Sequence, residues 1–212
     1  MIVAIDGPAA AGKGTLARRI AAHLGLAYLD TGLIYRAVGK KVIDAGADPE
    51  DEEAAEAAAQ ALKPEDLEAD GLRTDEAAQA ASKVSAIPGV RAALLEFQRS
   101  FAANPPAGKN GAVLDGRDIG TVVCPEARVK LFVTAATEVR AERRFKELQD
   151  RDLEAIYARV LEDMKVRDAR DSSRAASPLE PANDAHIIDT SALDADQVFA
   201  QALEIVASSG AA

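Results

Sequence analysis

Cysteine, histidine and tryptophan are almost missing from this sequence. Its 212 residues include one cysteine, Cys124, two histidines and no tryptophan. A single cysteine excludes an intrachain disulfide framework and is typical of proteins from a reducing compartment. His23 and His186 lie far apart and have too few cysteines beside them for a zinc site. We therefore expect no structural metal, and we expect Cys124 to be a buried apolar residue.

Long hydrophobic runs are also missing. No apolar stretch reaches the roughly 18 residues that a membrane-spanning helix requires. The N-terminus enters a short apolar run at once, without the basic region of a secretory signal peptide. These absences predict a cytoplasmic protein that does not associate with a membrane.

Positive charge is scarce, but only in one part of the chain. The net charge is −10. Residues 44–76 contain 13 acidic and two basic residues, a net charge of −11, so the remainder carries about +1. The acidic block predicts a solvated helical surface. No large basic patch is present, and we therefore expect no binding to nucleic acid.

The clearest positive signal is a glycine-rich loop near the N-terminus. Residues 2–5 form an apolar, β-branched run typical of a buried parallel strand, and an apolar helical pattern follows from Leu16. Between them lies a G-x-x-x-x-G-K-G-T segment, the spacing of a P-loop. We expect it to bind ATP through Gly7, Pro8, Ala9, Ala10, Ala11, Gly12, Lys13, Gly14 and Thr15.

The chemistry of this loop follows from its parts. Glycines allow the backbone to approach a phosphate, and the free N–H groups at a helix N-terminus favour an anion. Lys13 is expected between the β- and γ-phosphates, and the Thr15 hydroxyl is expected to bind Mg²⁺, directly or through water. Gly14 stands where Ser or Thr usually follows the lysine, an ending that resembles nucleoside monophosphate kinases. The alternative is a glycine turn that matches the motif by chance. The predicted strand, loop and helix together argue against it.

Charged residues also follow two further predicted strands. Asp30, Thr31 and Arg36 come after the strand at 26–29, and Arg117 and Asp118 come after the strand at 111–114. The carboxyl ends of parallel strands form the ligand crevice of doubly wound folds. The simpler interpretations are that Thr31 caps a helix, and that 115–118 is a turn with a local ion pair.

A third group of charges lies on two predicted helices. Arg140, Arg143 and Arg144 share a helix face, and an interruption follows at 150–153. The next helix has an apolar face formed by Leu153, Ile156, Tyr157, Val160, Leu161 and Met164, which continues through Arg167, Asp171 and Arg174. Buried guanidinium groups need anions, so we expect a mobile lid over a nucleotide. The alternative is a ladder of surface ion pairs.

The strand pattern predicts one α/β domain. Five short strands are expected at 2–5, 26–29, 111–114, 129–133 and 185–189. We assign 1–36, 105–142 and 175–212 to a core, about 37–104 to a helical insertion that binds the monophosphate, and about 143–174 to the lid. The predicted architecture is a three-layer P-loop kinase fold with a five-stranded parallel sheet.

Four motifs together resemble the bacterial cytidylate kinases. They are residues 5–8 with 12–15, residues 30–36, residues 115–118 with 120–123, and residues 167–174. The resemblance covers nearly the whole chain and implies transfer of the γ-phosphoryl of ATP to CMP or dCMP by a monomer. In the longer members of that family a β-rich insertion occurs. Here 63–72 is short and without alternation, so the insertion is expected to be mainly helical.

The resemblance also implies a role for individual residues. Asp118 would read the amino group and ring nitrogen of cytosine, with help from Ser82 and Arg91. Thr31 and Asp171 would contact the sugar. The phosphates would be neutralised by Arg36, Arg117, Arg167 and Arg174, with Arg143 as a further lid arginine.

Other functions stay open at this point. A P-loop kinase for UMP, AMP or a shikimate-like hydroxyl compound would share the loop, although an acceptor without phosphate would not need so many cations. A nucleotide-gated switch is a third possibility. A GTPase would carry an Asn-Lys-x-Asp guanine reader, and the sequence has none.

Overall fold

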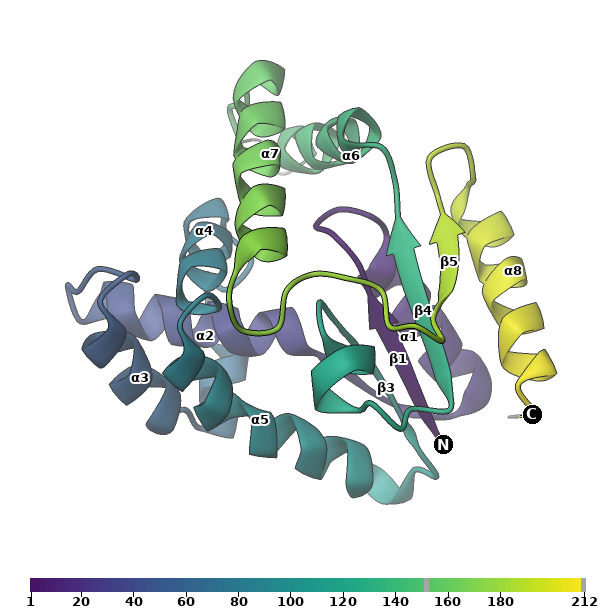
Figure 1. The fold of residues 1–212 in the computed structure, drawn as a ribbon. Helices are drawn as coiled ribbons and strands as arrows, with labels where there is room; N and C mark the ends of the chain where they lie inside the picture. The colour runs from purple at the N-terminus through teal and green to yellow at the C-terminus, as the bar shows by residue number, and fades with distance from the viewer. Residues whose placement is uncertain (151–152, 211–212) are drawn as a thin grey trace.

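A twisted sheet of five parallel strands forms the centre of the molecule (Figure 1). The computed structural model describes residues 1–150 and 153–210. The sheet order is β2-β3-β1-β4-β5, and every pair of neighbouring strands is parallel. The strands are β1 Ile2–Asp6, β2 Ala27–Asp30, β3 Ala112–Gly116, β4 Val129–Thr134 and β5 His186–Asp189.

Helices cover both faces of this sheet, which gives the three-layer α/β fold that the sequence predicts. On one face, α1 Lys13–Leu24 and α8 Ala195–Ser208 pack on Val3 and Ile5. On the other, α2 Thr31–Asp44 and α5 Pro88–Ala103 pack on Ala4. Since β1 is buried on both faces, it has the continuous apolar sequence of a central parallel strand.

The chain between β2 and β3 is helical. After α2 come α3 Glu52–Gln60, a short 3₁₀ turn η1 Pro64–Glu68, α4 Asp75–Val84 and α5. These helices lie to one side of the sheet in Figure 1, and no strand occurs between residues 31 and 111. Small side chains let the helices approach closely, because α4 buries four alanines.

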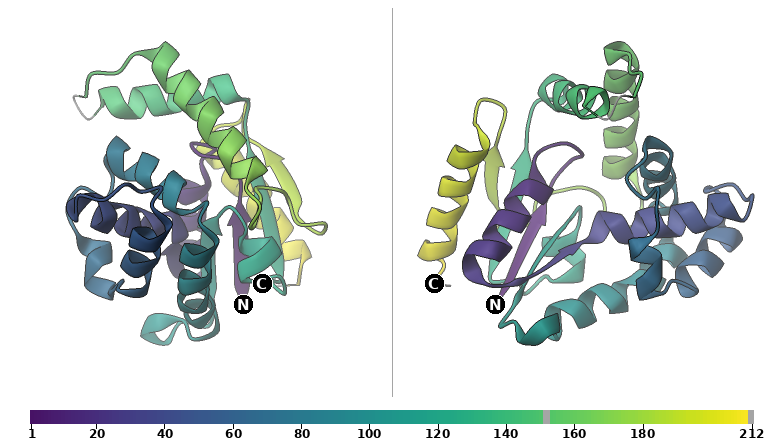
Figure 2. Two further views of the ribbon diagram at one scale, coloured as in Figure 1. Left: turned by 60° about the vertical axis from the view of Figure 1, so that its left-hand side comes forward. Right: turned by 180° about the vertical axis from the view of Figure 1, so that it is seen from behind.

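Two helices arch over the carboxyl ends of the strands. α6 Thr137–Gln149 leaves β4, and α7 Tyr157–Ser173 returns toward the sheet (Figure 2). The sequence predicts Leu153 and Ile156 on the apolar face of this second helix, but α7 begins only after them and both are about half exposed. The Leu153 amide instead donates to the carbonyl of Leu148 at the end of α6.

The structure bears on several smaller expectations. Cys124 is buried, as predicted. Residues 151–152 and 211–212, which fall within the expected lid and core ranges, lie outside the described residues. Within the described part of the chain, no helix is long and apolar enough to cross a membrane.

The packing of α2 on α4 yields a testable prediction. A Cβ added to Gly39 would lie 2.8 Å from the Cβ of Ala80 and 3.0 Å from the backbone of Ala81. Gly39→Ala should therefore lower the free energy of unfolding by about 1 kcal/mol, and Gly39→Val by about 2 kcal/mol or more, through overpacking. Urea unfolding measures both.

The neighbouring residue provides the control for this pair of variants. Lys40 makes only a surface ion pair with Asp44, so Lys40→Ala should change stability by less than about 1 kcal/mol. Wild-type stability for Gly39→Val would contradict the close packing of the two helices.

Candidate active site

The loop after β1 forms an anion-binding cradle at the start of α1. Gly7 has φ 141°, and a Cβ there would collide with the carbonyl oxygen of Val133. Gly12, with φ 94°, occupies the N-cap position of α1 without a side-chain cap. The first N–H groups of α1 therefore lack a capping side chain and can serve a bound anion.

Lys13 lies inside the cradle, and within the described residues its ammonium group forms no ion pair. Its Nζ donates to the Pro8 carbonyl at 2.7 Å, and its side chain is buried. Burial, followed by the positive charge of Arg117, lowers the pKa of Lys13 to about 7. A polyphosphate in the loop would restore the charged form, because opposite charge stabilises an ammonium group.

The carbonyl groups of the loop are held from outside. Arg140 Nη1 donates to the Ala9 carbonyl at 3.3 Å, and Thr190 Oγ1 donates to the Ala11 carbonyl at 3.2 Å. Arg140 also forms a two-point ion pair with Asp168 of α7, with N–O distances of 3.1 and 2.7 Å. The arch formed by α6 and α7 is thus bonded directly to the phosphate-binding loop.

Arg143 lies at a different place from the one that the sequence suggests. Its Nη1 donates to Thr190 Oγ1 at 2.9 Å and its Nη2 to the Thr190 carbonyl at 2.7 Å, so it braces the outside of the loop. The described residues that line the cavity beside this loop include Arg144 but not Arg143. The reason is helix geometry, since residues 143 and 144 point about 100° apart.

The main cavity of the site, about 390 Å³ in volume, joins this loop to the ends of β2 and β3. Most of the expected site residues line it. They are Ala9, Ala10, Gly12, Lys13, Gly14 and Thr15 of the loop, together with Thr31, Arg36, Arg91, Arg117, Asp118, Arg167, Asp171 and Arg174. Gly7, Pro8 and Ala11 shape the loop from behind, and Ser82 lies just outside the lining.

The hydrogen bonds of Asp30 and Thr31 test the simple interpretation that Thr31 caps a helix. Asp30 is the N-cap of α2, since its Oδ1 accepts from the Leu33 amide at 3.1 Å. The sequence-based suggestion that Thr31 caps this helix is therefore wrong. The Thr31 hydroxyl instead donates to the Asp115 carbonyl at 2.7 Å, which joins the ends of β2 and β3.

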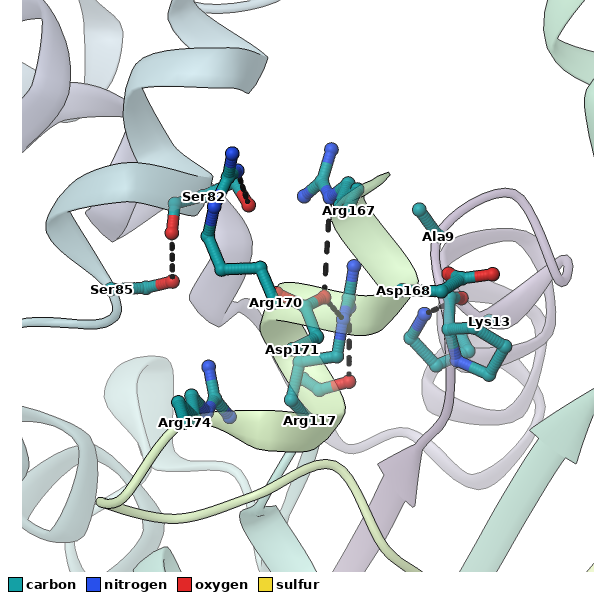
Figure 3. Close-up of polar contacts among 12 residues, drawn as sticks. Ala9, Lys13, Ser82, Ser85, Arg117, Arg167, Asp168, Arg170, Asp171 and Arg174 are labelled. Carbon is teal, nitrogen blue, oxygen red and sulfur yellow. Dashed lines mark hydrogen bonds and ion pairs between the residues drawn. The ribbon is translucent and has the colours of Figure 1, made fainter. Parts of the chain in front are cut away.

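Arginines of α7 and the β3 end surround one buried carboxylate (Figure 3). Asp171 is 3% exposed and accepts from Arg117 Nε at 2.9 Å, while Arg167 Nε is 4.0 Å away. The Nε of Arg167 and the Nη2 of Arg174 are buried and find no hydrogen-bond partner among residues 1–150 and 153–210. Burial, then the charge of Arg117, lowers the pKa of Arg167 to about 10. These are not surface ion pairs, and the unused donors suit an anion.

Arg36 lies on the insertion side of the same cavity. Its Nη1 donates to the carbonyls of Leu72 and Thr74 at 3.1 and 3.3 Å. Burial is the main cause that lowers the pKa of its guanidinium group. Arg36 therefore has a fixed position beside the cavity and no carboxylate among its hydrogen-bond partners.

The far end of the cavity holds a buried ion pair. Arg91 and Asp118 are 8% and 5% exposed, and Arg91 Nη2 donates to Asp118 Oδ2 in a very short contact. Arg91 also donates to the Ser85 carbonyl at 3.1 Å and lies over the ring of Tyr35. Its Nε has no partner. A planar ligand with both donor and acceptor edges matches this pair of side chains.

Ser82 is bonded to a residue of the 167–174 motif to which the sequence assigned no role. Arg170 Nη1 donates to Ser82 Oγ at 2.7 Å, across the space between α7 and α4 (Figure 3). Arg170 lies three residues after Arg167 and four before Arg174, and this helical spacing was the signal for it.

Two further carboxylates lie at the strand ends that the sequence places in the ligand crevice, although the sequence assigned them no role. Asp30 and Asp115 both line the cavity, and Tyr28 donates to Asp115 Oδ1 at 3.3 Å. Burial, then the negative charge of Asp30, raises the pKa of Asp115 to about 6. With the hydroxyl of Thr15 they form an oxygen-rich wall that fits Mg²⁺, a cation that prefers carboxylate and hydroxyl or water oxygens.

A strand, a phosphate-binding loop and a helix, with a second, arginine-rich half in the same cavity, define a P-loop kinase with two anionic substrates. The comparisons with known proteins agree. The chain matches the cytidylate kinase family over residues 3–208. It belongs to that family and is a nucleoside monophosphate kinase, as its motifs suggest.

Individual relatives show how far the similarity extends. The chain is 71% identical to the cytidylate kinase of Paramagnetospirillum magneticum, over 98% of each chain. It is 61% identical to that of Rhodospirillum rubrum, over 98% of this chain and 97% of the relative. A crystal structure of an uncharacterized protein from Eubacterium ventriosum shares the fold, with a TM-score of 0.55, 14% identity and coverage of 100% and 99%.

Asp6, at the end of β1, provides a prediction on pH. It is 5% exposed, and burial raises its pKa from 3.8 to about 6. The folded chain therefore binds this proton more tightly than the unfolded chain. The protonated carboxyl of Asp6 therefore stabilises the folded state. This contribution is complete below about pH 4 and is lost as the pH rises through 6.

Replacement of Asp6 should remove this pH dependence. In Asp6→Asn, the stability relative to wild type should increase between pH 4 and 6, by up to about 1.4 kcal/mol per pH unit. Urea unfolding of both proteins across that range measures the difference, and Asp115 titrates equally in both. Parallel stability curves would show that Asp6 has an ordinary pKa.

Proposed function

We propose that the protein transfers the γ-phosphoryl group of ATP to CMP or dCMP and releases ADP with CDP or dCDP. The observation that carries this proposal is the buried Arg91–Asp118 pair at the end of an arginine-lined cavity that begins at the P-loop. One end suits a polyphosphate, the middle suits a monophosphate, and the far end suits a base.

The donor half is the loop from Gly7 to Thr15. Its backbone N–H groups would hold the β-phosphate of ATP, and Lys13 would bridge the β- and γ-phosphates. Mg²⁺ would be held by Thr15 with Asp30 and Asp115, directly or through water, and would supply further positive charge at the phosphates. Arg143 would keep the loop in shape through Thr190, rather than contact the nucleotide.

The acceptor half is the arginine set around Asp171. Arg36, Arg117, Arg167 and Arg174 would bind the monophosphate and neutralise the charge that develops during transfer. The transition state of phosphoryl transfer is loose and highly charged, so positioning and positive charge supply most of the rate. Thr31 and Asp171 would contact the sugar. The unpartnered N–H groups of Arg167 and Arg174 support this assignment.

The base would be read by Asp118 and Arg91. Cytosine presents an amino group that a carboxylate accepts, and a ring nitrogen and a carbonyl that a guanidinium can serve. Uracil presents a carbonyl oxygen where cytosine has the amino group, and two acceptors would then face each other. Ser82, released from Arg170, would complete the pocket.

The domain assignment follows the same division. The core would carry the donor half together with Asp118, the insertion at about 37–104 would bind the monophosphate substrate, and the segment at about 143–174 would act as the lid. Two contacts of the lid segment support this division, since Asp168 of the lid pairs with Arg140 of the core and Arg144 of the lid pairs with Asp75 of the insertion. We also propose that the enzyme is a cytoplasmic monomer without nucleic-acid partners.

UMP and AMP are the alternative acceptors, and a substitution distinguishes them. Asp118→Asn should lower the ratio of kcat/KM for CMP to that for UMP by about 10- to 100-fold, since one base-reading contact contributes about 1–3 kcal/mol of discrimination. A coupled assay of ADP release measures the ratio. The variant keeps the shape of the side chain, so its fold should survive, which circular dichroism checks.

The same assay can contradict the role of Asp118, and a second variant serves as its control. A CMP/UMP ratio that stays at the wild-type value in Asp118→Asn would mean that Asp118 does not read the base. Lys83→Ala is the control, because Lys83 pairs with Asp48 and Glu50 on the outside of the insertion and should leave the ratio unchanged.

A further inference from the structure

A buried carboxylate outside the substrate cavity joins the two halves of the site. Asp6 is the last residue of β1 and immediately precedes the P-loop. Its Oδ1 accepts from the Ile119 amide at 2.8 Å and its Oδ2 accepts from the Gly120 amide at 2.7 Å. The described residues that line the main cavity do not include Asp6.

Those two amides begin a single π-helical turn, η3 Ile119–Val123. The turn starts directly after Asp118, which has φ −145° and ψ 26°. Inside the turn, the amides of Val122 and Val123 donate to the Asp118 carbonyl at 2.9 and 3.1 Å. The backbone of Asp118 is therefore fixed on one side by its own turn and on the other by the carboxylate of Asp6.

This arrangement leaves the Asp118 side chain little freedom. Its carboxylate points toward Arg91, and each of the two peptide groups that follow donates one charge-assisted hydrogen bond to Asp6. Gly120 adds to the constraint, because a Cβ there would lie 3.2 Å from Lys130 Cδ and 3.4 Å from Asp6 Oδ2. A displacement of the turn would move Asp118 with it.

A purely structural role for Asp6 explains less. Two amides of a turn can be satisfied by neutral oxygens, whereas an ionised carboxylate is costly to bury. Among the charged groups, Asp118 raises the pKa of Asp6 and Lys13 lowers it. Lys130, which lies beside Gly120, gives its ion pair to Asp184 at 2.8 Å.

We propose that Asp6 is a positioning residue for base recognition, which sets the Asp118 carboxylate against the base through the Ile119 and Gly120 amides. The proposal rests on the proposed function, because it assigns to Asp6 the placement of the group that reads cytosine. It links the phosphate-binding loop of the donor half to the selectivity of the acceptor half.

The test is the selectivity of Asp6→Asn in the full-length enzyme. An amide has one acceptor oxygen, so its NH₂ group would face one of the two backbone N–H groups. We expect the ratio of kcat/KM for CMP to that for UMP to fall roughly tenfold or more, through a higher KM for CMP. The KM for ATP should stay within about twofold. An unchanged ratio in the folded variant would reduce Asp6 to a structural residue and overturn the proposal.

A double variant tests whether Asp6 acts through Asp118. In an Asp118→Asn background the base is no longer read by a carboxylate, so adding Asp6→Asn should leave the CMP/UMP ratio unchanged. A second, additive fall of the ratio would show that Asp6 acts by another route. Should Asp6→Asn fail to fold, Asp6→Ser keeps one acceptor oxygen without the charge, and the same outcomes apply to it.

A matched control and the wild-type enzyme complete the experiment. Asp184→Asn removes the partner of Lys130 on the other side of Gly120 and should leave the ratio at the wild-type value. If the wild-type enzyme phosphorylates CMP and UMP equally well, the base-reading part of the proposed function fails. If wild type discriminates and Asp6→Asn discriminates equally, only the role of Asp6 fails.

Discussion

Buried positive charge without enough negative charge to match it is the constraint on which this structure depends. A guanidinium group removed from water is costly unless an anion or a hydrogen-bond acceptor meets it. Around the cavity, Arg117 and Arg167 share Asp171, and within the described residues Arg167 and Arg174 keep buried N–H groups without hydrogen-bond partners. In the proposed function, the substrates supply the phosphates that these groups lack.

The helices that carry these charges are bonded to the parts that they serve. Arg140 joins α6 to the P-loop and, through Asp168, to α7. Arg144 joins α6 to Asp75 on the insertion. α6 is therefore tied to the loop, to α7 and to the insertion by charged contacts.

The base-reading end follows a different physical rule. Arg91 and Asp118 satisfy each other in the free site, and Arg170 satisfies Ser82. In the proposed function, a base exchanges these contacts for its own, and a base that offers the wrong edge would leave buried groups unpaired. Discrimination by unpaired groups exceeds discrimination by shape alone. The support of Asp118 by Asp6 makes that exchange depend on the strand that also carries the P-loop.

Much of this could be predicted from the sequence, because the decisive signals are local. The apolar run of β1 and the glycines at 7 and 12 specify the P-loop, and helical spacing places Arg167, Asp171 and Arg174 on one face. The misses have physical reasons. Asp6 acts across more than 110 residues on a π-turn that no local pattern predicts. The sequence places Arg143 and Arg144 on one helix face, but the packing of α6 directs Arg143 to Thr190 and Arg144 into the cavity. The start of α7 after Ile156 depends on how α6 ends.

The most direct test of the account is the initial rate of ADP formation by the wild-type enzyme with CMP, dCMP, UMP, AMP and GMP at saturating MgATP. The arginine set and the Arg91–Asp118 pair predict the highest kcat/KM for the cytosine monophosphates. UMP should be about 10- to 100-fold poorer, and the purines should be poorer still. Equal values for UMP and CMP would contradict the account at its centre.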